Sequence, residues 1–169
     1  MSDVLPWLNY QWRFDFPVGM FRAIVERARG TPARLEEGVR GASADRLTRR
    51  PGEAWSAQEH AGHLIAVERL WRTRLDEYAR GEATLSAADM QNRLTKESRY
   101  NERPIAAILE EFRAARAATV RALDALGLDA AARVAHHPRL DRPMRLVDHC
   151  FFAAEHDDHH LAIIHELRR

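Results

Sequence analysis

The chain has 169 residues, with 26 lysine and arginine residues against 25 aspartate and glutamate residues, so its formal net charge is +1. This length predicts a single domain over residues 1–169. The charge balance excludes an electrostatic case for nucleic acid or an anionic membrane as a partner. Hydrophobic residues make up 46% and charged residues 30% of the chain, which is typical of an ordinary globular protein.

The single cysteine, Cys150, excludes an internal disulfide and a cysteine-based zinc site. We expect Cys150 to be a core residue rather than a nucleophile, because it falls in the middle of an expected helix without an activating neighbour. No stretch approaches the roughly 20 apolar residues of a membrane span, and no secretion signal is recognisable. These features favour a cytoplasmic location.

Apolar residues recur mostly every three or four positions, so we expect an all-α protein. The expected long helices cover about residues 17–29, 56–80, 104–126 and 146–167. Four such helices predict a four-helix bundle, with short extra helices in the connections. In the first helix, Thr31 suits an N-cap and Pro32 the first helical position, so this helix either restarts there or kinks and continues to about residue 39.

The ends and connections carry further signals. Ser56 followed by Glu59 predicts a capping box at the start of the second helix. Short helices are expected near residues 45–47 and within the polar segment 82–103, whereas residues 136–143 are expected to form a loop. The aromatic residues between positions 7 and 16 are expected to pack against the bundle, with a pocket rim or a dimer contact as the less favoured alternative.

Histidine is concentrated in two stretches, one at the start of the second helix and one in the last helix. His156 and His160 are four residues apart on an apolar face, a spacing that lets two imidazoles bind one metal ion. The third ligand would then be His60 or His63. Three neutral imidazoles with one open position are typical of a catalytic divalent metal. A packed or solvated histidine pair is the alternative, since such spacings also arise by chance.

Other motifs do not fit. The zincin motif His-Glu-x-x-His, which would supply a general base, does not occur, and neither do the paired Glu-x-x-His motifs of di-iron bundles. Glycine-rich phosphate loops and Gly-x-Ser-x-Gly are also missing from the sequence.

The two histidine motifs together resemble the DinB-like (DinB/YfiT) superfamily of metal-binding four-helix bundles. The resemblance rests on Trp55-Ser56-x-x-Glu59-His60-x-x-His63-Leu64 and on His156-x-x-x-His160-Leu161-x-x-Ile164, and it extends over nearly the whole chain. It implies one divalent ion, usually zinc or nickel and in some cases iron, copper or manganese, on His63, His156 and His160. It also implies a homodimer. Relatives include S-transferases that use the low-molecular-weight thiols bacillithiol or mycothiol, and a mycothiol-dependent maleylpyruvate isomerase.

The helical wheel and the resemblance differ on the third ligand. The wheel puts His60 nearer the centre of the apolar stripe, whereas the resemblance implies His63, with His60 as a neighbour. His149 lies two turns before His156, about 10 Å away along the helix, so we expect it to be buried and hydrogen-bonded rather than a ligand. His159 is expected to be exposed. Asp157 is expected to be a solvated carboxylate, with orientation of a ligand imidazole as the alternative.

The loop expected at residues 136–143 contains two arginines of interest. Arg139 or Arg142 could hold an anionic substrate or thiol near the metal, and a plain surface turn is the alternative. The leading hypothesis is a metal-dependent enzyme, a thiol S-transferase or a hydrolase, acting on a small molecule; its catalytic residues and general base are not identified. The alternatives are a non-catalytic metal-binding or stress-response protein with a structural ion, and a plain interaction bundle without a metal.

Overall fold

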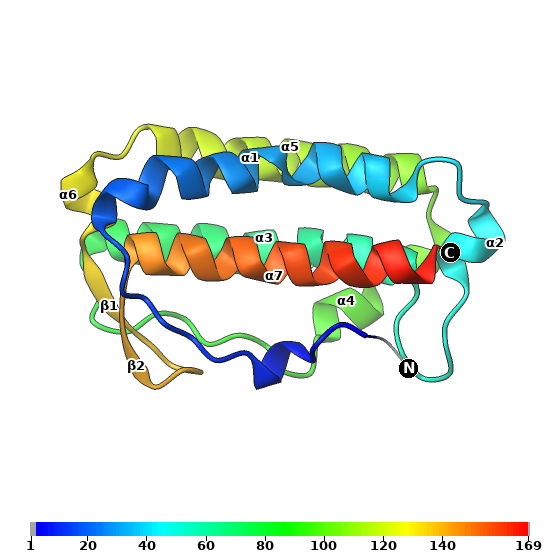
Figure 1. Cartoon of the computed structure of the whole chain (residues 1–169), viewed down its shortest axis with the longest axis horizontal. Helices are drawn as coiled ribbons and strands as arrows, with labels where there is room; N and C mark the ends of the chain where they lie inside the picture. The colour runs from blue at the N-terminus through cyan, green and yellow to red at the C-terminus, as the bar shows by residue number, and fades with distance from the viewer. Residues whose placement is uncertain (1–2, 169) are drawn as a thin grey trace.

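The computed structural model describes residues 3–168. Its long helices are α1 (Phe21–Val39), α3 (Ala57–Arg80), α5 (Ile105–Asp124) and α7 (Leu146–Leu167). They lie in two layers, α1 beside α5 and α3 beside α7 (Figure 1). The expectation of a four-helix bundle is therefore confirmed.

The order of the helices around the bundle differs from their order along the chain. Each long helix packs mainly on two others: α1 and α3 both contact α5 and α7. α1 and α7 run in one direction, and α3 and α5 run in the other (Figure 1). Since α3 and α5 are parallel neighbours, residues 81–104 must return along the whole length of the bundle, and this return brings a long polar segment beside the starts of both helices.

Short helices occupy the connections, as expected. They are α2 (Ala44–Thr48), α4 (Arg93–Glu97), α6 (Leu128–Ala131) and the 3-10 turns η1 (Trp7–Asn9), η2 (Val18–Met20) and η3 (Tyr100–Glu102). In the described part of the chain, none of the helices combines the length and the apolar character needed to cross a membrane.

The start of α3 is fixed by the predicted capping box. The Ser56 hydroxyl accepts the Glu59 backbone N–H at 3.1 Å, and the Glu59 carboxylate accepts the Ser56 N–H at 2.9 Å. Arg50 donates to the same carboxylate. α3 ends at Gly81, whose φ of +73° favours glycine. These contacts set the direction in which the first turns of α3 present their histidines.

α1 neither restarts nor uses Thr31 as an N-cap. The helix runs unbroken from Phe21 to Val39, and Thr31 is fully buried inside it. Pro32 has no N–H to offer the carbonyl of Ala28, but the Arg116 guanidinium of α5 donates to that carbonyl at 3.0 Å. Arg116 therefore donates the hydrogen bond that the proline cannot, and because Arg116 belongs to α5, the sequence of α1 alone does not indicate it.

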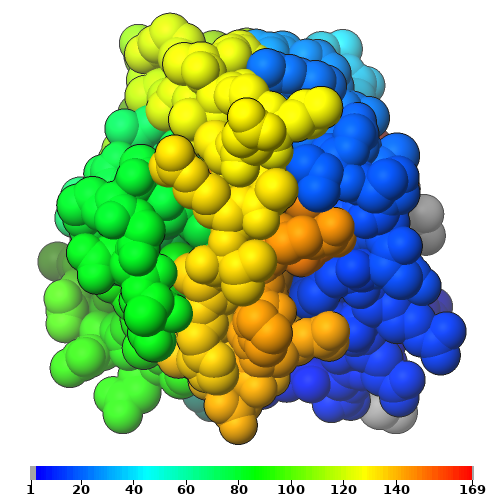
Figure 2. Space-filling model, turned by 90° about the vertical axis from the view of Figure 1, so that its left-hand side faces the viewer, coloured from blue at the N-terminus to red at the C-terminus, as the bar shows by residue number. Residues whose placement is uncertain are grey.

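The loop expected at residues 136–143 is confirmed only for the turn at residues 138–141, because the flanking residues form an antiparallel hairpin of β1 (Val134–His137) and β2 (Arg142–Arg145). His136 directs its backbone toward residues 83–85: its N–H donates to Ala83 at 2.8 Å and its C=O accepts from Leu85 at 3.0 Å. Because both backbone groups of His136 bond to residues 83–85, the residue opposite it in the hairpin, Pro143, has no hydrogen bond to donate to β1. At the end of the bundle the hairpin lies between the segment after α3 and the N-terminal segment (Figure 2).

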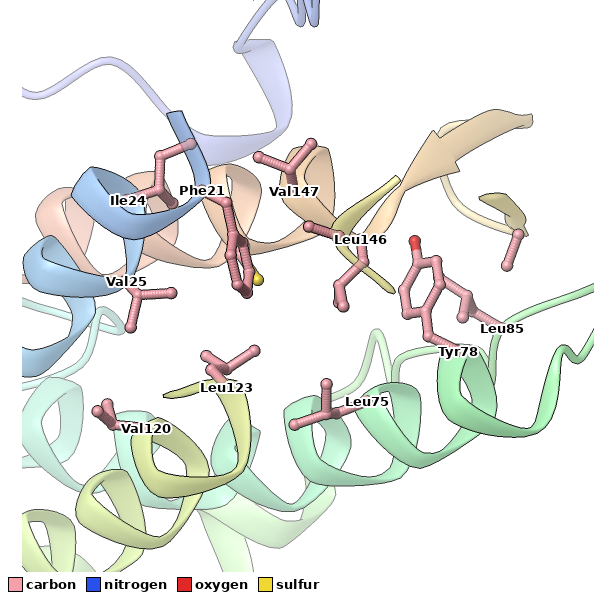
Figure 3. Close-up of a cluster of buried hydrophobic side chains, with 13 residues drawn as sticks. Phe21, Ile24, Val25, Leu75, Tyr78, Leu85, Val120, Leu123, Leu146 and Val147 are labelled. Carbon is pink, nitrogen blue, oxygen red and sulfur yellow. The ribbon is translucent and has the colours of Figure 1, made fainter. Parts of the chain in front are cut away.

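The hydrophobic core draws on all four long helices. At the end of the bundle nearest the hairpin, Phe21, Leu75, Leu123 and Leu146 point toward one another from α1, α3, α5 and α7 (Figure 3). Cys150 belongs to this cluster, and burial raises the pKa of its thiol to about 12. The expectation that Cys150 is a core residue is confirmed.

A buried network of charges also joins the four helices. Arg116 of α5 donates to Glu68 of α3 at 2.6 Å and to Asp157 of α7 at 2.5 Å. Thr31 of α1 donates to Asp157 at 3.0 Å, and Thr119 donates to Glu68 at 2.6 Å. The side chains of Arg116, Glu68 and Asp157 are only 1–3% exposed. The expectation of a solvated Asp157 was therefore wrong, because the buried cation comes from a distant helix; the network fixes the rotation of α7 next to His156.

Candidate metal centre

Three histidines from two helices converge at one point. His63 comes from the second turn of α3, and His156 and His160 come from one face of α7, which runs antiparallel to α3. The Nε2 atom of His156 lies 3.3 Å from Nε2 of His63 and 3.2 Å from Nε2 of His160. One ligand atom from each of the three residues lies within 4.8 Å of the others. The structure thus brings together the three histidines that the family resemblance implied.

The donor set has the dimensions and the charge state that a metal ion requires. An ion about 2.0–2.1 Å from each nitrogen in tetrahedral geometry separates the nitrogens by roughly 3.3 Å. Burial, followed by the charges of His60 and His159, lowers the pKa of His63 to about 3. Burial also holds the pKa values of His156 and His160 well below the usual range. All three imidazoles are therefore neutral near pH 7 and keep lone pairs for an ion.

Neighbouring side chains orient two of these rings. The Nδ1 atom of His63 lies 2.9 Å from the Thr95 hydroxyl, and Nδ1 of His160 lies 2.8 Å from Nδ1 of His60. A neutral imidazole carries one N–H. If His63 and His160 donate from Nδ1, their Nε2 lone pairs face the common point, which is the arrangement that metal-ligating histidines usually adopt. Among the described residues, no protein group pairs with the buried Nδ1 of His156.

His60 occupies the role of a neighbour rather than a member of the cluster. Its ring faces Nδ1 of His160, which is the nitrogen pointing away from the other two histidines. Burial, followed by the charge of His159, lowers the pKa of His60 to about 4. It can therefore accept a hydrogen bond from His160 as a neutral ring. The helical wheel favoured His60 because it weighs only the apolar stripe of α3 and not the position of α7.

The cluster opens onto a pocket of about 530 Å³. His63, His156 and His160 form one wall, and the remaining lining includes four large aromatic side chains: Trp7, Trp55, Trp71 and Phe152. This size is typical of sites for small molecules. An ion bound by the three histidines would therefore face the pocket rather than be sealed in the core.

The N-terminal aromatic segment divides between the two expected roles. Trp12, Phe14 and Phe16 pack on the phenylalanines of α7, as expected. Trp7 instead belongs to the pocket wall, and its ring lies 5.2 Å from that of His156. The pocket-rim interpretation, which the sequence favoured less, is the one that applies to Trp7.

Two expectations about the remaining histidines of α7 were wrong. His159 is 7% exposed instead of solvent-facing, because Trp7 and Tyr10 cover the outer side of α7 and the Tyr10 hydroxyl lies 3.5 Å from Nδ1 of His159. His149 is buried as expected, but neither ring nitrogen has a hydrogen-bond partner among residues 3–168. The rings of Trp71, Tyr78, His137 and Phe152 surround it, but none of them is hydrogen-bonded to it.

The chain is similar to known proteins in sequence family and in fold. A sequence model of the DinB superfamily matches residues 27–164. The chain belongs to the DinB superfamily. Its fold is similar to that of YfiT from Bacillus subtilis, with a TM-score of 0.79 and 18% identity over 94% of this chain and 91% of that one. YfiT is described as a probable metal-dependent hydrolase with an unusual four-helix bundle topology. No curated protein matches the chain.

Sequence reasoning missed two residues of this DinB-superfamily site. Thr95 lies in α4, within the polar crossover segment, where no periodicity marks it. Arg74 of α3 was not singled out because charged residues on helices are ordinarily solvated. Its guanidinium is buried, donates twice to the Ser86 carbonyl and lies 3.0 Å from His137 of β1. Both residues line the pocket, and only the crossover segment and the hairpin bring their partners to the site.

The two candidate arginines of the hairpin also separate. Arg139, in the turn between the strands, lines the pocket. Arg142 points elsewhere: it is exposed and donates to the Trp12 carbonyl at 3.2 Å. Of the two, only Arg139 is in a position to touch a molecule in the pocket.

Proposed function

We propose that this protein is a metal-dependent enzyme, hydrolase-like in its chemistry, that acts on a small molecule in the pocket. His63, His156 and His160 would hold one divalent ion. The observation that carries the proposal is the position of the cluster: its three convergent Nε2 atoms lie in the wall of a pocket of about 530 Å³. The description of YfiT as a probable metal-dependent hydrolase supports the same reading.

The residues divide the work as follows. The three imidazoles provide neutral ligands, and Thr95 and His60 orient two of them through Nδ1. When bound, a divalent ion acidifies a water or thiol molecule and polarises a carbonyl or similar oxygen. The four aromatic side chains place apolar surface beside the ligands, and apolar surface lowers the local dielectric and strengthens electrostatic interactions there.

Thiol transfer is the second candidate, and one feature favours it. Among the described residues that line the pocket, Asp89 is the single carboxylate. It accepts the backbone N–H groups of Gln91 and Arg93, and these bonds, led by that of Arg93, lower its pKa. Asp89 is therefore poorly suited as a general base. A thiol, with a reference pKa of about 8.5, needs less help from a base than water does.

The metal site is tested by metal content. Wild-type protein reconstituted with zinc or with nickel is expected to retain one ion per chain after gel filtration, measured by elemental analysis. The His160→Ala variant is expected to lose the ion, because two imidazoles bind a divalent metal weakly. His165→Ala is the matched control, since His165 is exposed on the same helix. Full retention of the ion by His160→Ala would contradict the proposal.

The reaction is tested on the metal-loaded protein. Ester and amide substrates with a chromogenic leaving group are offered with and without a low-molecular-weight thiol. Metal-dependent turnover without thiol identifies a hydrolase, and turnover only with thiol identifies a transferase. A stoichiometric ion whose X-ray absorption spectrum shows four protein ligands, with no turnover, would identify a structural ion and overturn both candidates.

A further inference from the structure

Arg139 brings an unpaired positive charge into the pocket wall. It is half-buried, in the turn between β1 and β2, and its guanidinium lies 5.5 Å from the ring centre of Trp7 and 5.2 Å from that of Phe152. No hydrogen bond or ion pair joins it to any of the described residues. The aromatic faces attract the cation but do not accept its N–H donors in the way that an oxygen does. A partly desolvated cation without an acceptor is an unfavourable arrangement unless a ligand or water completes it.

The other arginines of the hairpin and the buried Arg74 already have partners, and Arg69 of α3, which also lines the pocket, is exposed. Arg74 donates to Ser86 and lies beside His137, and Arg145 of β2 is paired with Asp148 at 2.5 Å. Arg142 donates to a backbone carbonyl outside the pocket. Arg139 is therefore the guanidinium of the hairpin whose donors remain free for a bound molecule.

The rest of the pocket complements this charge with apolar surface. Its lining includes three exposed apolar side chains: Leu8, Met90 and Leu94. Asp89, the one carboxylate among the described lining residues, is engaged with backbone N–H groups. A ligand with an apolar body and one anionic group would pair with Arg139 and place its body against these apolar side chains.

The position of Arg139 also limits the length of the ligand. Its guanidinium lies over Phe152, and Phe152 precedes His156 on α7 by four residues, about one helical turn of ~5.4 Å. Trp7 contacts both rings, at 5.1 Å from Phe152 and 5.2 Å from His156. If Arg139 binds the anionic group of a ligand, only a few covalent bonds are needed between that group and the part of the same ligand that reaches the histidine cluster.

We infer that the pocket binds a small carboxylate with an apolar body, and that Arg139 binds the carboxylate through paired N–H···O bonds. The reacting group of the same molecule then faces His63, His156 and His160. This second part rests on the proposed function, whereas recognition of the carboxylate by Arg139 does not.

The inference is tested by binding, without turnover. Phenylacetate, 3-phenylpropanoate and 4-phenylbutanoate are compared with their neutral amides by calorimetry and by quenching of the pocket tryptophans. The measurement is made on metal-free and on zinc-loaded full-length protein, because a carboxylate can also bind an ion directly. In metal-free protein the best acid is expected to bind about 10- to 100-fold more tightly than its amide, the range of a charge-assisted hydrogen bond.

Variants of the hairpin identify the group responsible. Arg139→Gln is expected to remove the preference for the acid, and Arg139→Lys to retain part of it, because lysine keeps the charge but not the planar pair of donors. Arg142→Gln makes the same change of charge in the same hairpin, outside the pocket, and is expected to leave the preference unchanged. Circular dichroism melting curves of each variant establish that it is folded.

The outcomes separate this inference from the proposed function. A preference for the acid that depends on Arg139 in metal-free protein supports the inference, even if no ion is ever retained and the proposed function fails. If Arg139→Gln binds the acid as tightly as wild type does, the inference is overturned while the metal site can stand. Equal affinity of wild type for acids and amides, or binding of none of the three acids, also overturns it.

Discussion

At the scale of single residues, the orientation of each imidazole decides whether the cluster can hold an ion. Thr95 and His60 contact the Nδ1 atoms of His63 and His160, and thereby turn Nε2 of each ring toward the common point. Groups that orient metal ligands in this way commonly contribute a factor of 10 to 100 to metal affinity. The residues that touch the ligands therefore matter nearly as much as the ligands.

Thr95→Val is expected to weaken zinc binding by about 10- to 100-fold, because valine has a similar shape but no hydroxyl for Nδ1 of His63. Competition with a chelating dye measures the affinity. Thr73→Val is the control, since the Thr73 hydroxyl donates to a backbone carbonyl of its own helix. Unchanged affinity in Thr95→Val would contradict the assigned role.

The buried histidines also predict how stability depends on pH in the metal-free protein. The folded pKa values of His63 and His60 are lowered to about 3 and about 4, below the unfolded value near 6.5. The unfolded state therefore binds more protons between these values, so stability is full above about pH 6.5 and is lost as the pH falls. Each such histidine removes roughly 1.4 kcal/mol per pH unit in that window.

Urea denaturation of chelator-treated protein at pH 7.5, 6.5 and 5.5 measures this dependence. The free energy of unfolding is expected to fall more between pH 6.5 and 5.5 than between pH 7.5 and 6.5, over a range where carboxylates with reference pKa values near 4 hardly titrate. A value that stays constant down to pH 5.5 would show that these imidazoles are not buried in neutral form.

Gly62 is required by a close approach rather than by a turn. A Cβ atom added there would lie 2.1 Å from the ring of Tyr100, which packs across the start of α3. Gly62→Ala is expected to destabilise the fold by about 1–3 kcal/mol, since the ring must move. Gly30→Ala in α1 is the control: nothing lies within 4 Å of its added Cβ, so it is expected to stabilise by about 0.5–1 kcal/mol. Chemical denaturation measures whether the free energy of unfolding falls in Gly62→Ala and rises in Gly30→Ala.

At the scale of elements, the buried charges set how the helices face one another. Arg116 of α5 bonds Glu68 of α3 and Asp157 of α7, and burial, which would lower its pKa, is outweighed by these two charges, which raise it. Asp157 adjoins the ligand His156 in sequence. The network therefore holds α7 in the rotation that points His156 and His160 at His63.

Arg116→Met is expected to lower the free energy of unfolding by about 3–5 kcal/mol, because it leaves two buried carboxylates without their cation. Arg113→Met on the same helix removes an exposed arginine paired with Glu36, and is expected to change stability by no more than about 1 kcal/mol. Urea denaturation measures both. Similar losses in the two variants would contradict the role given to the buried network.

At the scale of the whole molecule, the metal site joins elements far apart in the chain. α3 and α7 are antiparallel neighbours, and the cluster lies between the first turns of α3 and the middle turns of α7. The crossover segment adds Thr95, and the hairpin and the N-terminal segment close the pocket with Arg139 and Trp7. An ion bound there would connect two helices that the unfolded chain keeps apart.

Binding of the ion is therefore expected to stabilise the whole fold. Free zinc at about 1,000 times its dissociation constant should raise the free energy of unfolding by about 4 kcal/mol, provided that the unfolded chain does not bind it. Denaturation with zinc and with a chelator measures the difference. His160→Ala should gain much less from zinc, and an equal gain in that variant would place the stabilising ion elsewhere.

The sequence by itself determined the helices, the bundle and the placement of two candidate ligands on one face of α7. Periodicity and capping are local properties, so Ser56 and Glu59 marked the start of α3, and the spacing of His156 and His160 placed both on one face. Local signals were insufficient where partners come from elsewhere in the chain. The two four-residue strands, one of which contains Pro143, depend on hydrogen bonds between His136 and residues 83–85. The unbroken helix at Pro32 depends on Arg116, which donates to the carbonyl that the proline leaves free.

Only the tertiary structure decided which side chains face the site. The packing of α3 against α7 directs His63 into the cluster and leaves His60 behind His160. Asp157 is buried because a cation reaches it from α5, and His159 is covered because the N-terminal segment returns along α7. A helical wheel records the direction of a side chain from its own helix. What that side chain meets depends on contacts between distant segments, and those contacts form only when the chain folds.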